Sequence, residues 1–181
     1  MDRLKPLVDF LKSIGVEQVA HTHKTYMGHL VNLYRLMESK GFSEELCRAG
    51  MFHSIYGTER FQGFKLPVDR RAEVRELIGE RAEYLAYLNC AIDRTVFDRV
   101  VASGKPPYRI LDRLTGKEVE LSADDFNDLC RIHFYDYMEQ VGRSQTWEYR
   151  RAGYRALAER LGKEAREMYD EIFAAEKAAA S

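Results

Sequence analysis

The sequence has no excess of charge of either sign and no long apolar run. Its 181 residues carry 28 Lys and Arg against 29 Asp and Glu, which gives a net charge of −1. This balance lacks the basic surplus that drives sequence-independent binding to nucleic acid. No stretch approaches the roughly 20 apolar residues that a membrane-spanning helix needs. We therefore expect neither nucleic acid nor a membrane as a partner.

Cysteine is also scarce. Cys47, Cys90 and Cys130 are odd in number and far apart, and no two of them form a Cys-x-x-Cys pair. This pattern favours a reduced chain with buried thiols over a disulfide scaffold. The first residues lack the apolar stretch of a signal peptide. The sequence thus predicts a cytoplasmic protein.

What the sequence does contain is the apolar periodicity of helices. Apolar residues make up 45% of the chain, a share typical of a packed globular protein. Residues with helical spacing predict helices over 3–14, 24–40, 43–53, 69–78, 80–103, 122–140, 145–161 and 163–178. Residues 108–121 instead predict a β-hairpin that turns at Thr115-Gly116. We expect an all-α bundle with one small hairpin, in which residues 1–140 form the domain and residues 141–181 a helical extension packed on it.

The histidines are clustered rather than scattered. Four of the five, His21, His23, His29 and His53, fall within 33 residues. Helical phase puts His29 and His53 on the inward faces of consecutive helices, where a single histidine is most simply a core residue bonded to a carbonyl. Two facing imidazoles also offer the nitrogen lone pairs that a transition metal takes. Spacing alone leaves both interpretations open.

His29-Leu30 and the later tract Ala49 to Thr58 follow a pattern known from one protein family. They resemble the HD-domain superfamily of all-helical, metal-dependent phosphohydrolases. The closest similarity is to an HD-like group that carries His-Ser-Ile-Tyr-Gly-Thr, here residues 53–58, in place of the His-Asp motif. The resemblance spans most of residues 20–140. It implies an HD-like bundle that holds a divalent metal ion, which would be iron, manganese or zinc.

The resemblance also implies a ligand set. His29 and His53 would bind the metal together with a distant Asp, for which Asp93 in the tract Cys90 to Arg94 is the first candidate. Weaker candidates are Asp98, Asp112 and Asp136. Ser54 stands where the family has a metal-binding Asp, so another residue replaces that ligand, the site holds one metal only, or catalysis has been lost. His21 is the preferred replacement, because it lies where the chain enters the helix that carries His29.

Polar residues that follow His53, and Asn89 one helical turn before Asp93, receive further roles. Glu59 would act as a general base, and Asn89 would orient substrate or water. Other residues could contact an anionic substrate through hydroxyls, a close backbone approach or positive charge. They are Tyr56, Gly57, Thr58, Arg60 and Lys65. Each also has a plainer interpretation as part of a solvated loop.

Three functions remain open from the sequence. A metal-dependent phosphohydrolase acting on a small phosphorylated metabolite or nucleotide is favoured. The alternative is an HD-type oxygenase with mononuclear or dinuclear iron, although no histidine lies between His53 and His133 to complete a di-iron ligand set. The third is a catalytically degenerate HD-like binding module, which the substitution at Ser54 favours. Trp147, Tyr149 and Tyr154 predict either an oligomer contact, making a homo-oligomer possible, or the packing of a helix onto the domain.

Overall fold

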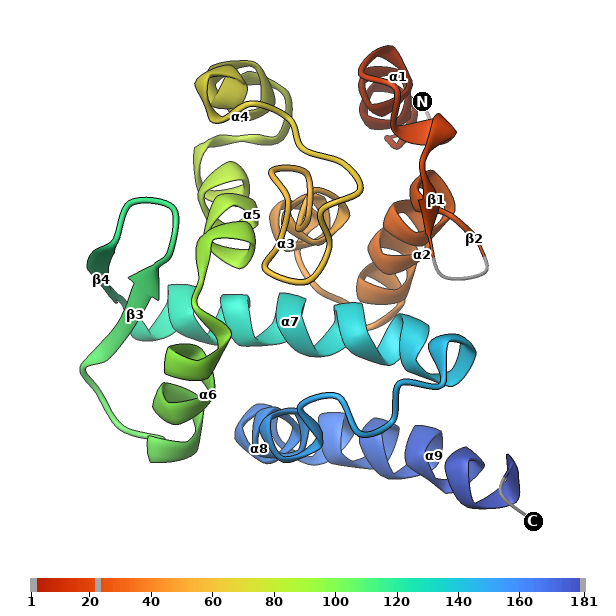
Figure 1. Cartoon of the computed structure of the whole chain (residues 1–181), viewed down its shortest axis with the longest axis vertical. Coiled ribbons are helices and arrows are strands. Elements are labelled where there is room, and N and C mark those ends of the chain that lie inside the picture. Colours follow the sequence, from red (N-terminus) through yellow and green to blue (C-terminus); the bar gives the residue numbers. More distant parts are fainter. Residues whose placement is uncertain (1–2, 22–23, 180–181) are drawn as a thin grey trace. The chain divides into compact units, whose positions relative to one another are not determined.

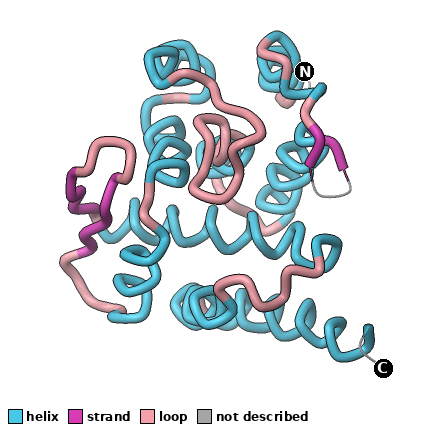
Figure 2. The backbone as a smooth tube through the Cα atoms, viewed as in Figure 1, coloured by secondary structure: helices cyan, strands magenta, loops and turns pink. Residues whose placement is uncertain are grey.

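The computed structural model describes residues 3–21 and 24–179, and most of them are helical (Figures 1 and 2). The predicted mostly-α fold with one small hairpin is confirmed. The chain divides into two compact units, Met1–Cys90 and Ala91–Ser181. The expected boundary near residue 140 is a different division of the chain and stays a prediction. Among the described residues, no helix is both long and apolar enough to cross a bilayer.

The first unit is built from helices, a short two-stranded sheet and one long loop. Its helices and strands are α1 (Lys5–Ser13), β1 (Ala20–His21), β2 (Lys24–Thr25), α2 (Tyr26–Ser39), α3 (Glu44–Met51), α4 (Arg71–Ile78) and α5 (Glu80–Ala91). N-cap residues begin α2 and α3, the helices whose segments carry His29 and His53. The Thr25 hydroxyl accepts a hydrogen bond from the Gly28 amide to begin α2, and the Ser43 hydroxyl accepts one from the Leu46 amide to begin α3. The helix start predicted at Ser43 is thus confirmed.

Helices α2 and α3 pack closely against each other. Gly50 of α3 faces α2, and a Cβ atom built there would lie 2.4 Å from the sulfur of Met37. Without a side chain at residue 50, α3 approaches α2 with no displacement of Met37. This close approach brings together the two segments that carry His29 and His53.

The second unit consists of helices and the predicted hairpin. Its elements are α6 (Arg94–Ser103), β3 (Tyr108–Asp112), β4 (Lys117–Leu121), α7 (Ala123–Ser144), α8 (Arg151–Leu161) and α9 (Lys163–Ala179). The strands are antiparallel, with Tyr108 opposite Leu121, and β3 packs beside α6. The Ser122 hydroxyl accepts from the Asp125 amide at 3.1 Å, as a capping box requires. Helix α7 runs to Ser144, beyond its predicted end.

The prediction of one long helix over residues 80–103 is wrong. Helix α5 ends at Ala91, and Asp93 adopts an extended backbone whose carboxylate accepts from the Val96 amide at 2.8 Å as the N-cap of α6. The Asp93 amide also donates to the Leu111 carbonyl of β3 at 2.9 Å. Pairing with the hairpin strand draws this segment out of helical geometry, while the apolar periodicity continues across the break.

The aromatic residues after α7 pack inside the second unit. Tyr154 is buried, and its ring stacks on Tyr137 with centroids 3.8 Å apart. Trp147 contacts Phe173 of α9 edge-on, with centroids 5.4 Å apart. The packing interpretation of this segment is therefore observed, and a homo-oligomer stays a prediction. The start of α8 at Arg151 is later than predicted, because Gln145 ends α7 in a left-handed conformation.

Candidate metal site

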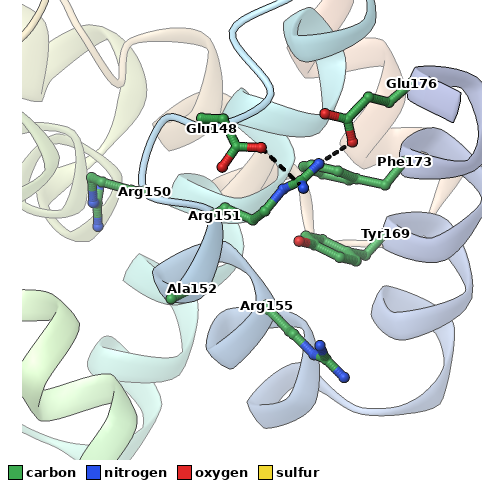
Figure 3. A pocket seen from close by; sticks show the side chains of 8 residues that line it. All are labelled: Glu148, Arg150, Arg151, Ala152, Arg155, Tyr169, Phe173 and Glu176. Carbon is green, nitrogen blue, oxygen red and sulfur yellow. Dashed lines mark hydrogen bonds and ion pairs between the residues drawn. The ribbon is translucent and has the colours of Figure 1, made fainter. Parts of the chain in front are cut away.

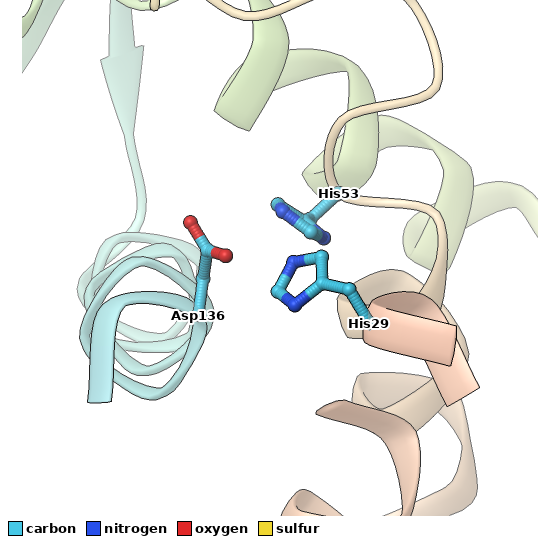
Figure 4. Close-up of side chains that lie close together, drawn as sticks. All are labelled: His29, His53 and Asp136. Carbon is cyan, nitrogen blue, oxygen red and sulfur yellow. The ribbon is translucent and has the colours of Figure 1, made fainter. Parts of the chain in front are cut away.

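His29 and His53 lie next to each other inside the first unit (Figure 4). Their ring centroids are 5.3 Å apart and their planes are nearly perpendicular, at 82°. The side chains are almost completely buried, with exposed fractions of 1% and 3%. The predicted adjacency of the two imidazoles is confirmed. His53, however, lies in the turn just after α3, whereas the periodicity predicts it on the face of that helix.

The orientation of the His53 ring leaves one nitrogen available to a metal. Its Nδ1 atom lies 2.8 Å from the carbonyl oxygen of Gly50. A carbonyl oxygen only accepts hydrogen bonds, so Nδ1 must carry the proton. In the neutral imidazole the lone pair is then on Nε2. Metal-binding histidines commonly donate their second ring nitrogen to a carbonyl in this way, which fixes both tautomer and orientation.

The backbone of His53 is held from α5. The Asn89 side-chain amide donates to the His53 carbonyl at 2.9 Å, and the Cys90 thiol donates to the same oxygen at 3.2 Å. Asn89 is buried, and this contact makes it a residue that positions His53 through the backbone. Its expected role in orienting substrate or water stays a prediction. All three cysteines are buried and none forms a disulfide, as predicted.

Ser54 forms a buried hydrogen bond with a tyrosine of α2. Its hydroxyl lies 2.9 Å from the hydroxyl of Tyr26, and both residues are buried. This pair adds no charge beside the histidines. Nothing in the sequence distinguishes Tyr26, because an aromatic residue at the start of an amphipathic helix is commonly a core residue.

The loop after Ser54 uses several of the expected substrate-binding residues for its own structure. Gly57 has a φ of +79°, and a Cβ atom there would lie 2.7 Å from Cγ of Lys65. The Thr58 hydroxyl accepts from the Phe61 amide at 2.9 Å, and the Thr58 amide donates to the Phe61 carbonyl. The close backbone approach expected at Gly57 is therefore made by the stem of Lys65. Substrate contacts by Gly57 and Thr58 stay predictions.

Three expected site residues in this loop are accessible to solvent. Glu59, Arg60 and Lys65 are all exposed, and two of them are cationic. An exposed position is compatible with contact to a ligand that arrives from solution. The predicted roles of these residues, Glu59 as a base and the cations as anion contacts, stay predictions.

A buried carboxylate anchors the loop to the rest of the unit. Glu83 of α5 is fully buried and accepts from Arg71 Nε at 2.6 Å, Arg71 Nη2 at 2.9 Å and the Tyr56 hydroxyl at 2.9 Å. Burial, and then the Glu83 carboxylate, raise the pKa of the Tyr56 phenol, so Tyr56 keeps its proton and donates. The guanidinium of Arg71 also lies 3.7 Å from the ring centroid of Tyr87. Tyr56 therefore has a structural partner, and its contact with a substrate stays a prediction.

We expect Glu83→Gln to lower the free energy of unfolding by about 2–4 kcal/mol, because breaking one side of a buried pair leaves the other charge without compensation. Urea denaturation followed by circular dichroism measures the change. The control is Glu73→Gln, which breaks the exposed pair with Arg70 and should leave the midpoint nearly unchanged. Equal midpoints for the two variants would contradict an anchoring role for Glu83.

The roles of the other expected ligands stay predictions. The side chain of His21 is outside the described residues. Asp93 acts as the cap of α6. Asp136 of α7, in the second unit, is a buried carboxylate whose Oδ1 accepts from the Gln140 amide at 2.9 Å. The Asp136 carboxylate offers one atom that could bind a metal ion.

Comparison with known proteins gives one match. Residues 10–94, just under half of the chain, match a family described as Domain of unknown function (DUF6817). The matched segment contains His29, His53 and Asn89 and ends before Asp136. No curated protein and no solved structure matches the chain. The resemblance to the HD-domain superfamily stays an expectation from the sequence.

Proposed function

We propose that His29 and His53 hold one divalent transition-metal ion, with one of the carboxylates that the sequence predicts as a further ligand. The observation that carries this proposal is the hydrogen bond from His53 Nδ1 to the Gly50 carbonyl, which leaves Nε2 as a ligand atom beside the His29 ring. Iron, manganese and zinc all accept two imidazoles and a carboxylate. We prefer Asp136 to Asp93, because the Asp93 carboxylate already serves as a helix cap.

Metal content tests this ligand set. Protein purified without chelator should contain a divalent metal by elemental analysis, and Asp136→Asn should weaken metal binding at least about tenfold. Asp93→Asn is the matched control, because Asn caps helices as well as Asp does, and it should keep the metal. Metal loss in Asp93→Asn alone would return the carboxylate role to Asp93. A wild-type protein that binds no divalent metal would overturn the site and favour the binding-module alternative.

For the reaction, we infer a hydrolase that acts on a small phosphorylated metabolite or nucleotide. A divalent ion in such a site lowers the pKa of coordinated water and polarises a phosphoryl oxygen. The protein's own contribution would be a proton acceptor, Glu59, and two exposed cations on the same loop, Arg60 and Lys65, that attract the phosphate. The uncharged Ser54–Tyr26 pair favours one metal ion over two, because no bridging carboxylate is present at that position.

An iron-dependent oxygenase is the second candidate. Two histidines and one carboxylate with open positions are also the ligand set of non-haem iron oxygenases. Two assays separate the candidates: phosphate release from a panel of phosphorylated metabolites and nucleotides, and oxygen uptake by protein loaded with iron under anaerobic conditions. Phosphate release without oxygen uptake supports the hydrolase. Oxygen uptake coupled to loss of an organic substrate would replace it with the oxygenase.

A further inference from the structure

A cavity of about 790 Å³ lies within the second unit, between α8 and α9 and the segment that precedes α8 (Figure 3). Its volume is in the range of small-molecule sites. All the residues that line it belong to the second unit, so it is separate from the pair of histidines described above. Its lining combines aromatic rings with charged side chains of both signs.

Aromatic rings form one wall of the cavity. Tyr169 and Phe173 are one turn apart on α9, and their rings stack with centroids 4.2 Å apart and planes at 20°. Trp147 supports this wall by contacting Phe173 edge-on. The wall is flat and mainly apolar, which suits the face or edge of a further ring.

The arginines that line the cavity differ in their carboxylate partners. Arg151 forms ion pairs with Glu148 at 3.0 Å and with Glu176, as the dashed lines in Figure 3 show, and its guanidinium lies 5.0 Å from the Phe173 ring centroid. Arg150 is likewise paired with Asp98, through Nε at 2.8 Å. Arg150 therefore has one carboxylate partner, and the single charge of Arg151 is shared by two carboxylates.

Arg155 differs from the other two arginines of the lining. It is exposed and makes no hydrogen bond or ion pair with any other residue that the structure describes. It nevertheless lies close to the aromatic wall. Burial raises the pKa of the Tyr169 phenol, and the positive charges of Arg151 and Arg155 act against that shift. Arg155 thus brings one uncompensated positive charge to the edge of the cavity.

We propose that this cavity binds a small aromatic molecule that carries a single anionic group, such as a carboxylate. The ring would contact Tyr169 and Phe173, and the anion would pair with Arg155. One negative charge matches Arg155, the arginine of the lining that pairs with no carboxylate among the described residues. A more highly charged ligand would meet the carboxylates of Glu148 and Glu176, which line the same cavity.

Benzoate tests the proposal, because it combines a ring with one carboxylate. Trp147 is the only tryptophan of the chain, so its fluorescence in the full-length protein reports on the cavity wall that it contacts. Equilibrium dialysis with radiolabelled benzoate gives an independent measure of binding. Acetate supplies the anion without the ring, and benzyl alcohol supplies the ring without the charge. We expect benzoate to bind at least tenfold more tightly than either one.

Variants of Arg155 locate the charge contact. Arg155→Gln should weaken benzoate binding at least fivefold and leave benzyl alcohol binding unchanged, whereas Arg155→Lys should keep most of the benzoate affinity. Arg166→Gln is the matched control, because Arg166 is a cation of α9 outside the cavity that pairs with Glu159 at 3.6 Å. It should bind benzoate as the wild type does. Benzoate binding no tighter than acetate binding, or equal losses in Arg155→Gln and Arg166→Gln, would overturn the proposal.

Discussion

Replacement of His53 by alanine is expected to reduce affinity for a divalent transition metal at least about 100-fold and to abolish turnover. The change removes the Nε2 atom that the Gly50 hydrogen bond leaves available. Even residues that only support a metal ligand change affinity 10- to 100-fold, so loss of the ligand itself should exceed that range. Metal retained after dialysis against a metal-buffered solution measures the first effect. Phosphate release from the panel of phosphorylated metabolites and nucleotides measures turnover.

Two variants separate loss of a ligand from loss of the fold. His133 is another buried histidine, and its Nε2 accepts from Arg150 at 2.6 Å. In His133→Gln the amide oxygen can accept the same hydrogen bond, so this variant should keep its metal. Glu59→Gln should also keep the metal but slow turnover by roughly 100-fold, the effect expected for loss of a general base. Full metal content in His53→Ala would overturn the proposed site.

In the second unit, Asp98→Asn is expected to lower the free energy of unfolding by about 3–5 kcal/mol. The Arg150 side chain is only 13% exposed, and Asp98 accepts from two of its nitrogens. Burial acts most strongly and lowers the pKa of Arg150, but the hydrogen bonds that Arg150 donates to Asp98 and the charges of Tyr154, Asp98 and Tyr149 together outweigh it, so the pKa is raised. Asparagine keeps the size of aspartate and removes only its charge. The loss therefore measures the pairing of Arg150 and not a change in packing.

Chemical denaturation of the metal-free protein measures this difference. The control is Glu120→Gln, which breaks the exposed pair of Glu120 with Arg109 on the hairpin. Exposed pairs contribute little, so this change should cost less than about 1 kcal/mol. If Asp98→Asn lost no more stability than Glu120→Gln, Arg150 would not depend on Asp98 for its burial.

Elements whose signals are local were predicted well from the sequence. The caps at Ser43 and Ser122 and the hairpin around Gly116 depend on residues within a few positions of one another, and each is present in the structure. The helix break at Asp93 was not predicted, because it depends on a hydrogen bond to Leu111 across the second unit. Apolar periodicity shows which helix faces are buried. It does not reveal a break between two helices when the apolar spacing continues across the break.

By itself, the sequence determined that the protein is mostly helical and that the segments carrying His29 and His53 lie close together, although His53 lies in the turn after α3 and not on its face. Only the tertiary structure decided which way the His53 ring points and which side chains donate hydrogen bonds to the His53 carbonyl oxygen. Asn89 makes that contact from 36 positions away in the sequence, and Glu83 accepts the hydrogen bond of the Tyr56 hydroxyl from 27 positions away. Such contacts depend on how whole helices pack, which no pattern of neighbouring residues encodes.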